Sequence, residues 1–126
     1  MAQGEVRGYA ARARSTDTFG RVICNTRDQH FVVDGPVQNG CPGEAVTPAE
    51  LFLTGIAACG VELVQVIARD ENLPLKSVGV QIEGTLDRSK PVRKDVSLFN
   101  SVRLRFDLRG VTKEQGGLLI DRFKGR

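Results

Sequence analysis

The feature that most constrains the fold is an almost wholly apolar stretch, residues 51–67, in the middle of a chain of 126 residues. It follows Thr47-Pro48-Ala49-Glu50. Thr47 suits an N-cap, Pro48 suits the first helical position, and Glu50 completes a capping box with Thr47. Because Pro74 cannot continue a helix, we expect one helix from Pro48 to about residues 70–72.

The same stretch limits how the chain can be packed. It is short for a membrane span, and Glu62 and Gln65 interrupt it. We therefore interpret it as a core helix, buried on most sides. A helix this apolar in so short a chain needs more cover than one small sheet offers, which favours a partner subunit.

Alternating apolar residues predict strands on both sides of this helix. We expect an N-terminal antiparallel meander, a Gly- and Pro-rich loop over residues 35–43, and two further strands after the helix. The strands of the meander are expected at residues 6–15, 19–25 and 30–34, and the later ones at 77–86 and 102–108.

A second capping box, Thr112 with Gln115, predicts a short last helix. Gly116 and Gly117 weaken this helix by about 1 kcal/mol each relative to alanine. Strands and helices are segregated along the chain rather than strictly alternating, so the predicted fold class is α+β.

Composition excludes several kinds of protein. The N-terminus lacks the apolar core of a signal peptide, and a reducing cytoplasm is the expected compartment. The three cysteines show neither CxxC nor zinc spacing, so neither a disulfide framework nor a metal site is expected. The net charge of +3 is modest, and the arginines of residues 102–109 alternate with apolar residues, which is typical of the wet face of a strand rather than of a nucleic-acid site.

Several segments in order resemble the OsmC/Ohr superfamily of osmotically inducible and organic-hydroperoxide-resistance proteins. The resemblance covers about residues 9–126, and its most specific part is Pro-x-Glu-Leu followed by Ala-Ala-Cys. The segments are Val33-Asp34-Gly35-Pro36, Thr47-Pro48-Ala49-Glu50-Leu51, Ala57-Ala58-Cys59, Leu73-Pro74-Leu75 and Val111-Thr112-Lys113-Glu114-Gln115.

This resemblance implies an intertwined α+β homodimer with a long buried central helix and two active sites at the subunit interface. Catalytic members reduce organic hydroperoxides with a cysteine thiolate, and a second cysteine then forms an intramolecular disulfide. An external dithiol reductant, such as a lipoyl group or a thioredoxin-like donor, resets it. No bound cofactor or metal is implied.

Carried over by position, Cys59 matches the peroxidatic cysteine of the family. A cation must stabilise its thiolate, and Arg21 is the nearest match, with Arg12 and Arg14 as alternatives. Glu50 is a further candidate. Nine residues separate it from Cys59, or about 180° around a straight helix, so it would act through a kink or from the partner subunit.

Three departures from the family pattern keep alternatives open. Residues 1–126 are expected to form a single OsmC-like domain without the family's C-terminal cysteine segment, which leaves Cys24 and Cys41 as candidates to resolve Cys59. The carboxylate of the hydroperoxide-resistance branch would fall at Ala49, and no arginine matches the family position cleanly.

The sequence therefore supports two functions. The first is a thiol-dependent peroxidase for organic hydroperoxides, in which Phe52, Ile56 and Leu63 form an apolar wall for the substrate. The second is a non-catalytic OsmC-like dimer that binds a small apolar ligand at the subunit interface.

Overall fold

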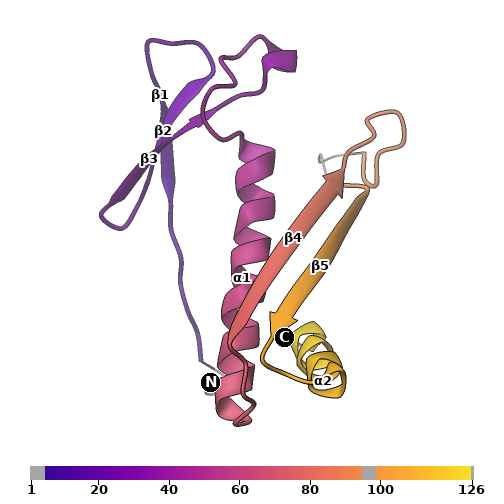
Figure 1. Ribbon diagram of the computed structural model, residues 1–126. Coiled ribbons are helices and arrows are strands. Elements are labelled where there is room, and N and C mark those ends of the chain that lie inside the picture. The colour runs from indigo at the N-terminus through magenta and orange to yellow at the C-terminus, as the bar shows by residue number, and fades with distance from the viewer. Residues whose placement is uncertain (1–4, 95–98, 126) are drawn as a thin grey trace. The chain divides into compact units, whose positions relative to one another are not determined.

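The computed structural model describes residues 5–94 and 99–125. It has the predicted α+β composition, with antiparallel strands and one long helix (Figure 1). Its contacts divide the chain into two compact units, Met1–Leu51 and Phe52–Arg126. Each unit is described below by itself.

The first unit contains a three-stranded antiparallel sheet in the order β1-β2-β3, which confirms the predicted meander. The strands are β1 (Arg12–Ser15), β2 (Arg21–Thr26) and β3 (Gln29–Asp34). The prediction that the first strand begins at residue 6 is wrong, since β1 begins at Arg12. Arg12 lies opposite Asn25, and β2 turns into β3 just beyond Thr26, so earlier residues have no strand to pair with.

The start of α1 (Pro48–Asp70) confirms the predicted capping box. The Thr47 amide and hydroxyl both donate to Glu50 Oε1 at 2.9 Å, and the Glu50 amide donates to Thr47 Oγ1 at 3.4 Å. Two of the amide groups that a helix start leaves without intrahelical partners are thereby satisfied. Between β3 and this cap the chain forms a single 3₁₀ turn, η1 (Val37–Asn39).

The end of α1 is set by Asn72, whose φ of 55° is left-handed. The Asn72 amide donates to the Arg69 carbonyl at 3.2 Å, and the Leu73 amide donates to the Ala68 carbonyl at 2.8 Å. This pair of bonds is a Schellman motif, in which asparagine is the residue most often used after glycine. The helix therefore ends two residues before Asn72, close to the predicted boundary.

The second unit packs the C-terminal part of α1 against a two-stranded antiparallel ribbon and a short helix. These are β4 (Ser77–Thr85), β5 (Ser101–Arg109) and α2 (Lys113–Lys124). β5 is one residue longer at each end than predicted. Thr112 and Gln115 form the predicted second capping box. The buried core consists of Val64, Ile67, Ala68 and Leu119, covered by partly buried residues of β4, β5 and α2.

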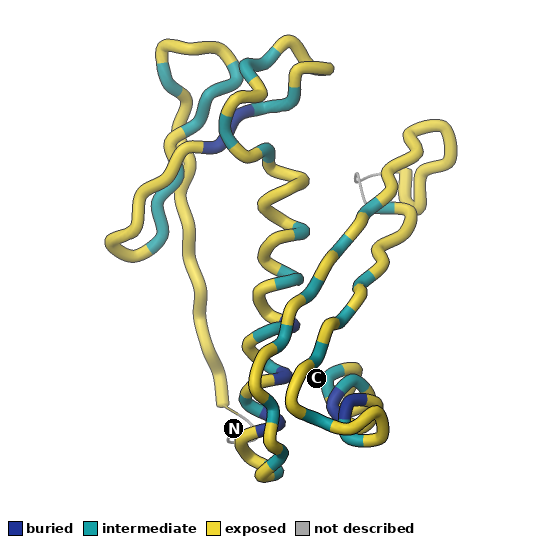
Figure 2. The backbone as a smooth tube through the Cα atoms, viewed as in Figure 1, coloured by how far each residue is buried: buried dark blue, intermediate teal, exposed yellow. Residues whose placement is uncertain are grey.

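The expectation that α1 is buried on most sides is wrong for the single chain. Its buried residues are Gly60, Val64, Ile67 and Ala68, all on one side of its C-terminal part, and the tube in Figure 2 is exposed along much of the helix. The helix is exposed elsewhere because the ribbon of β4 and β5 and helix α2 pack on one side of it only. By length and composition alone α1 could also cross a membrane, a test that core helices of soluble proteins pass too.

Candidate thiol site

Cys59 lies on the exposed side of α1. It is the exposed member of the three free cysteines, whereas Cys24 and Cys41 are half-buried. Cys59 thus lies outside the part of α1 that the single chain buries. The next residue, Gly60, is buried, because it faces Val80 and Phe106 of the ribbon. A helix turns about 100° per residue, so the neighbour of a buried position can face solvent.

Apolar side chains flank this thiol along one stripe of α1. Phe52, Ile56 and Leu63 lie seven residues before, three before and four after Cys59, which places all four within about 60° of the helix circumference. Phe52 is 58% exposed, and its ring stacks on Phe99 with centroids 5.9 Å apart. The arrangement offers an accessible sulfur beside an apolar surface, which suits a substrate with an apolar body.

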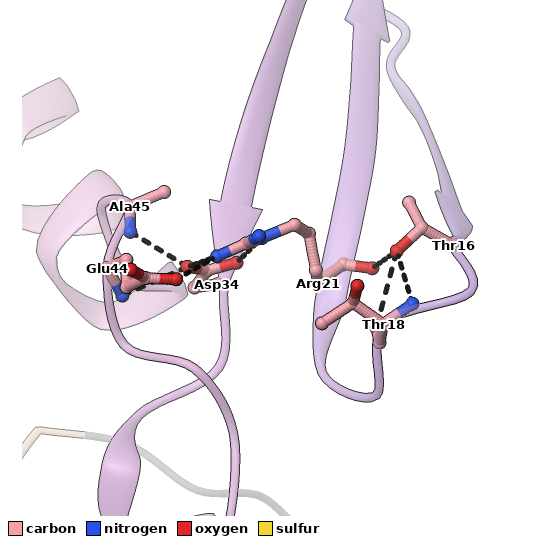
Figure 3. Close-up of polar contacts among 6 residues, drawn as sticks. All are labelled: Thr16, Thr18, Arg21, Asp34, Glu44 and Ala45. Carbon is pink, nitrogen blue, oxygen red and sulfur yellow. Dashed lines mark hydrogen bonds and ion pairs between the residues drawn. The ribbon is translucent and has the colours of Figure 1, made fainter.

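Arg21 lies at the start of β2 and points across the sheet toward the end of β3 (Figure 3). Its Nε donates to Asp34 Oδ1 at 2.8 Å and its Nη2 donates to Asp34 Oδ2 at 2.9 Å. Nη2 also donates to Glu44 Oε1 at 2.8 Å. The guanidinium therefore holds two carboxylates, one bidentately, which is the strongest geometry for such a pair.

Asp34 is the residue that sequence reasoning missed. It is fully buried, and besides Arg21 it accepts the amides of Glu44 and Ala45 at Oδ2, at 3.0 and 2.8 Å. The Arg21 guanidinium, then these amides, hold the pKa of the Asp34 carboxyl well below its usual range. Asp34, and to a lesser extent Glu44, raise the pKa of Arg21. A signal was present, since an aspartate directly before Gly35-Pro36 often organises a turn.

This network ties the segment before α1 to the edge of the sheet. Because Arg21 already faces two carboxylates, little of its positive charge is left to stabilise a thiolate. Arg21 belongs to the unit Met1–Leu51 and Cys59 to Phe52–Arg126. Neither unit by itself brings these two residues together.

Glu50 has the capping function described above. Its hydrogen bonds from the Thr47 amide and hydroxyl lower the pKa of its carboxyl. Within the first turn of a helix an ionised carboxylate is also favoured by the helix dipole. These contacts account for Glu50 without a chemical function.

The two candidate resolving cysteines both lie in the first unit. Cys24 is in β2, between Ala13 on β1 and Phe31 on β3. Cys41 lies after η1 in the predicted Gly- and Pro-rich loop. Its sulfur occupies the space that a Cβ atom would need at Gly20 or at Gly35. Cys41 is thus held by close packing against two glycines.

The described residues contain no group of three or more His, Cys, Asp and Glu side chains that could bind a metal ion.

A family model matches most of the chain. The sequence model of the family described as "OsmC-like protein" matches residues 41–122, a range that contains Cys59 and Glu50. A comparison with curated protein sequences gave no match.

Solved structures share the fold across nearly the whole chain. An OsmC-like protein from Mycoplasma pneumoniae superimposes with a TM-score of 0.80 at 14% identity, covering 95% of this chain and 82% of its own. The organic hydroperoxide resistance protein OsmC of Legionella pneumophila gives 0.71 at 22%, covering 93% and 82%. An organic hydroperoxide resistance protein from Elizabethkingia anophelis gives 0.75 at 17%, covering 94% and 82%. At these identities the likeness establishes the fold.

Proposed function

Because this chain belongs to the OsmC-like protein family, we propose that it is a thiol-dependent peroxidase that reduces organic hydroperoxides, with Cys59 as the peroxidatic residue. The observation that carries the proposal is the position of Cys59, an exposed thiol on the apolar stripe of α1. Two proteins with the same fold are described as organic hydroperoxide resistance proteins, which supports the choice of substrate.

The proposed reaction is a displacement at the O–O bond. The Cys59 thiolate attacks one peroxide oxygen and breaks this bond, giving a sulfenic acid, while the other oxygen leaves as an alkoxide and takes up a proton to become an alcohol. A second thiol then condenses with the sulfenic acid, forming a disulfide and releasing water. Cys24 and Cys41 are the candidates for that thiol, and an external dithiol, such as a lipoyl group or a thioredoxin-like donor, would reduce the disulfide.

Three arginines of the first unit are candidates to stabilise the Cys59 thiolate. Arg21 already donates hydrogen bonds to the carboxylates of Asp34 and Glu44. To stabilise the thiolate, it would have to break its hydrogen bond to Glu44. Arg12 and Arg14 carry charge that no carboxylate neutralises among the described residues. Glu50 would act indirectly, by fixing the start of the helix that carries Cys59.

A homodimer in the cytoplasm is the proposed working form. The OsmC-like fold is that of a soluble protein family. In this chain α1 exposes large apolar side chains, with Leu51 36% and Phe52 58% exposed. Exposed apolar surface of this kind is typical of an interface between subunits. A second copy would also supply the shielding that the single chain does not give Cys59.

The test is the intact mass of the reduced protein after one equivalent of cumene hydroperoxide, with hydrogen peroxide in parallel. We expect fast gain of one oxygen, or loss of two hydrogens where Cys24 or Cys41 resolves it, and a slower reaction with hydrogen peroxide. Cys59→Ser should abolish the reaction, and Cys24→Ser and Cys41→Ser serve as matched controls that each remove one thiol. Unchanged hydroperoxide consumption by Cys59→Ser would exclude the proposal.

A second candidate function is a non-catalytic dimer that binds a small apolar ligand. The observation that favours it is the pairing of Arg21 with Asp34 and Glu44, which leaves Cys59 without an assigned cation. An unchanged mass in the experiment above, together with saturable binding of an apolar probe that Phe52→Ser weakens, would support this alternative.

A further inference from the structure

A hollow on the sheet of the first unit contains Arg12 and Arg14, neither of which forms an ion pair with a carboxylate among the described residues. Its volume is about 590 Å³, and it is lined by residues from all three strands of the sheet: Arg12, Ala13, Arg14, Ile23, Asn25 and His30. The pairing of the strands explains why these side chains lie together. Arg12 lies opposite Asn25, Asn25 lies opposite His30, and Arg14 lies opposite Ile23, so these side chains share one face of the sheet.

Arg12 is held in place there by a neutral partner. Its Nε and Nη2 donate to Asn25 Oδ1 at 3.3 and 2.8 Å. Asn25 is fixed in turn, because its Nδ2 donates to the carbonyls of Arg27 and Gln29 at 3.0 and 3.2 Å. An amide orients the guanidinium without neutralising it, and the remaining N–H groups of Arg12 stay available to a ligand.

The other two polar groups of the hollow add donors. Asn25 Nδ2 lies 3.3 Å from His30 Nε2. An imidazole ring carries at least one N–H group, so His30 can supply one donor to a ligand in the hollow. Arg14 is exposed, and none of the ion pairs or side-chain hydrogen bonds of the described residues involves it. Arg21, by contrast, forms ion pairs with two carboxylates.

We propose that this hollow binds a small organic phosphate monoester. Two arginines without carboxylate partners match the charge of about −1.5 to −2 on a phosphate monoester, and its three terminal oxygens match the donors of Arg12, Arg14 and His30. Arg12 and Arg14 are two residues apart on one strand, or roughly 7 Å, a separation that two long side chains can close around one head group. Ile23, 40% exposed, gives an apolar contact for the organic part.

The experiment is a calorimetric or NMR titration of the full-length reduced protein with phenyl phosphate at low and at high salt. Inorganic phosphate, benzoate and benzyl alcohol are titrated in parallel. We expect saturable binding of phenyl phosphate, weaker binding of inorganic phosphate and of benzoate, none of benzyl alcohol, and weakening as salt rises. Binding of inorganic phosphate as tight as that of phenyl phosphate would overturn the assignment of an organic ligand.

Three variants separate a built site from general attraction to a cation. Arg14→Gln should weaken phenyl phosphate about tenfold, since a hydrogen bond to a charged group contributes about that much. Arg105→Gln is the matched control, because it removes one exposed arginine from β5 in the other unit and should change affinity less than twofold. Asn25→Ala keeps every charge but frees Arg12, and should weaken binding about threefold.

The outcomes decide the proposal without reference to peroxidase activity. Equal weakening by Arg14→Gln and Arg105→Gln would mean attraction to net charge only and would overturn it. So would the absence of saturable binding to the unmodified protein at low salt. Circular dichroism of each variant shows that the strands are retained, and Arg14→Gln removes no contact described in the fold.

Discussion

The buried carboxylate of Asp34 decides how the first unit holds the segment that leads into α1. A fully buried charge is costly unless it is paired and hydrogen-bonded. Asp34 meets both conditions through the guanidinium of Arg21 and the amides of Glu44 and Ala45. One side chain therefore links the start of β2, the end of β3 and the loop beyond it.

The pKa of Asp34 makes stability depend on pH in a defined direction. Its pKa is lowered in the folded protein, whereas the unfolded chain takes up the proton near its ordinary value of about 3.9. The stability that the ionised form contributes is therefore present above about pH 5 and is lost as pH falls toward the folded pKa. We expect the urea midpoint to fall steadily below pH 5.

Asp34→Asn tests the origin of that fall. The variant should be less stable than the unmodified protein at pH 7, and its midpoint should depend less on pH between 5 and 3. Asp17→Asn, which removes a carboxyl from the exposed turn between β1 and β2, is the control and should keep the original slope. Equal slopes for all three proteins would show that other carboxylates cause the acid sensitivity.

At the scale of elements, the ends of α1 depend on local sequence. Thr47 and Glu50 satisfy each other's amides, so Thr47→Ala should lower the free energy of unfolding by about 1 kcal/mol, while Thr47→Ser should change it little, because serine caps as well as threonine. Urea denaturation of the two variants measures the difference. A loss as large for serine as for alanine would show that the threonine methyl group, and not the cap, is responsible.

The ribbon of the second unit requires glycine at one position and not at another. A Cβ atom on Gly84 of β4 would lie 2.8 Å from the ring of Phe99 and 3.1 Å from Leu53, whereas one on Gly79 of the same strand would meet nothing within 4 Å. We expect Gly84→Ala to destabilise the protein by about 1–3 kcal/mol, as overpacking does. Gly79→Ala should be neutral or stabilising by up to about 1 kcal/mol. Thermal unfolding of the pair checks this, and similar midpoints would contradict it.

Local signals explain why most elements could be predicted from the sequence. Both capping boxes, the apolar run and the alternation of residues 77–86 and 102–108 act over a few residues and needed no knowledge of the fold. The pairing of Arg21 with Asp34 joins residues thirteen apart through the register of two strands, which alternation alone does not fix. The short β1 likewise depends on where its partner strand turns.

At the scale of the whole molecule, the exposure of α1 could not be predicted, because burial depends on which other elements reach the helix. The apolar run predicted that the helix needs cover, and the single chain covers one side only. The same limit applies to the site. Cys59 is a candidate through its family segment, and its environment depends on what covers the exposed side of α1. The contributions of Cys59, Arg21 and Glu50 to a reaction stay predictions.

The proposed dimer gives this exposed side its partner, and a single charge tests it. Ala58 is exposed on α1 and lies seven residues after Leu51, on the same side of the helix. In Ala58→Lys the new ammonium can pair with Glu62 four residues later, so the helix itself is not weakened. Buried in an interface, an added charge costs several kcal/mol. We therefore expect the dissociation constant to rise at least about 100-fold in sedimentation equilibrium. Phe19→Lys changes a 77% exposed aromatic in the turn between β1 and β2 and should leave assembly unaltered. If Ala58→Lys remains as dimeric as the unmodified protein, the interface does not use this side of α1, and the shielding of Cys59 must be sought elsewhere.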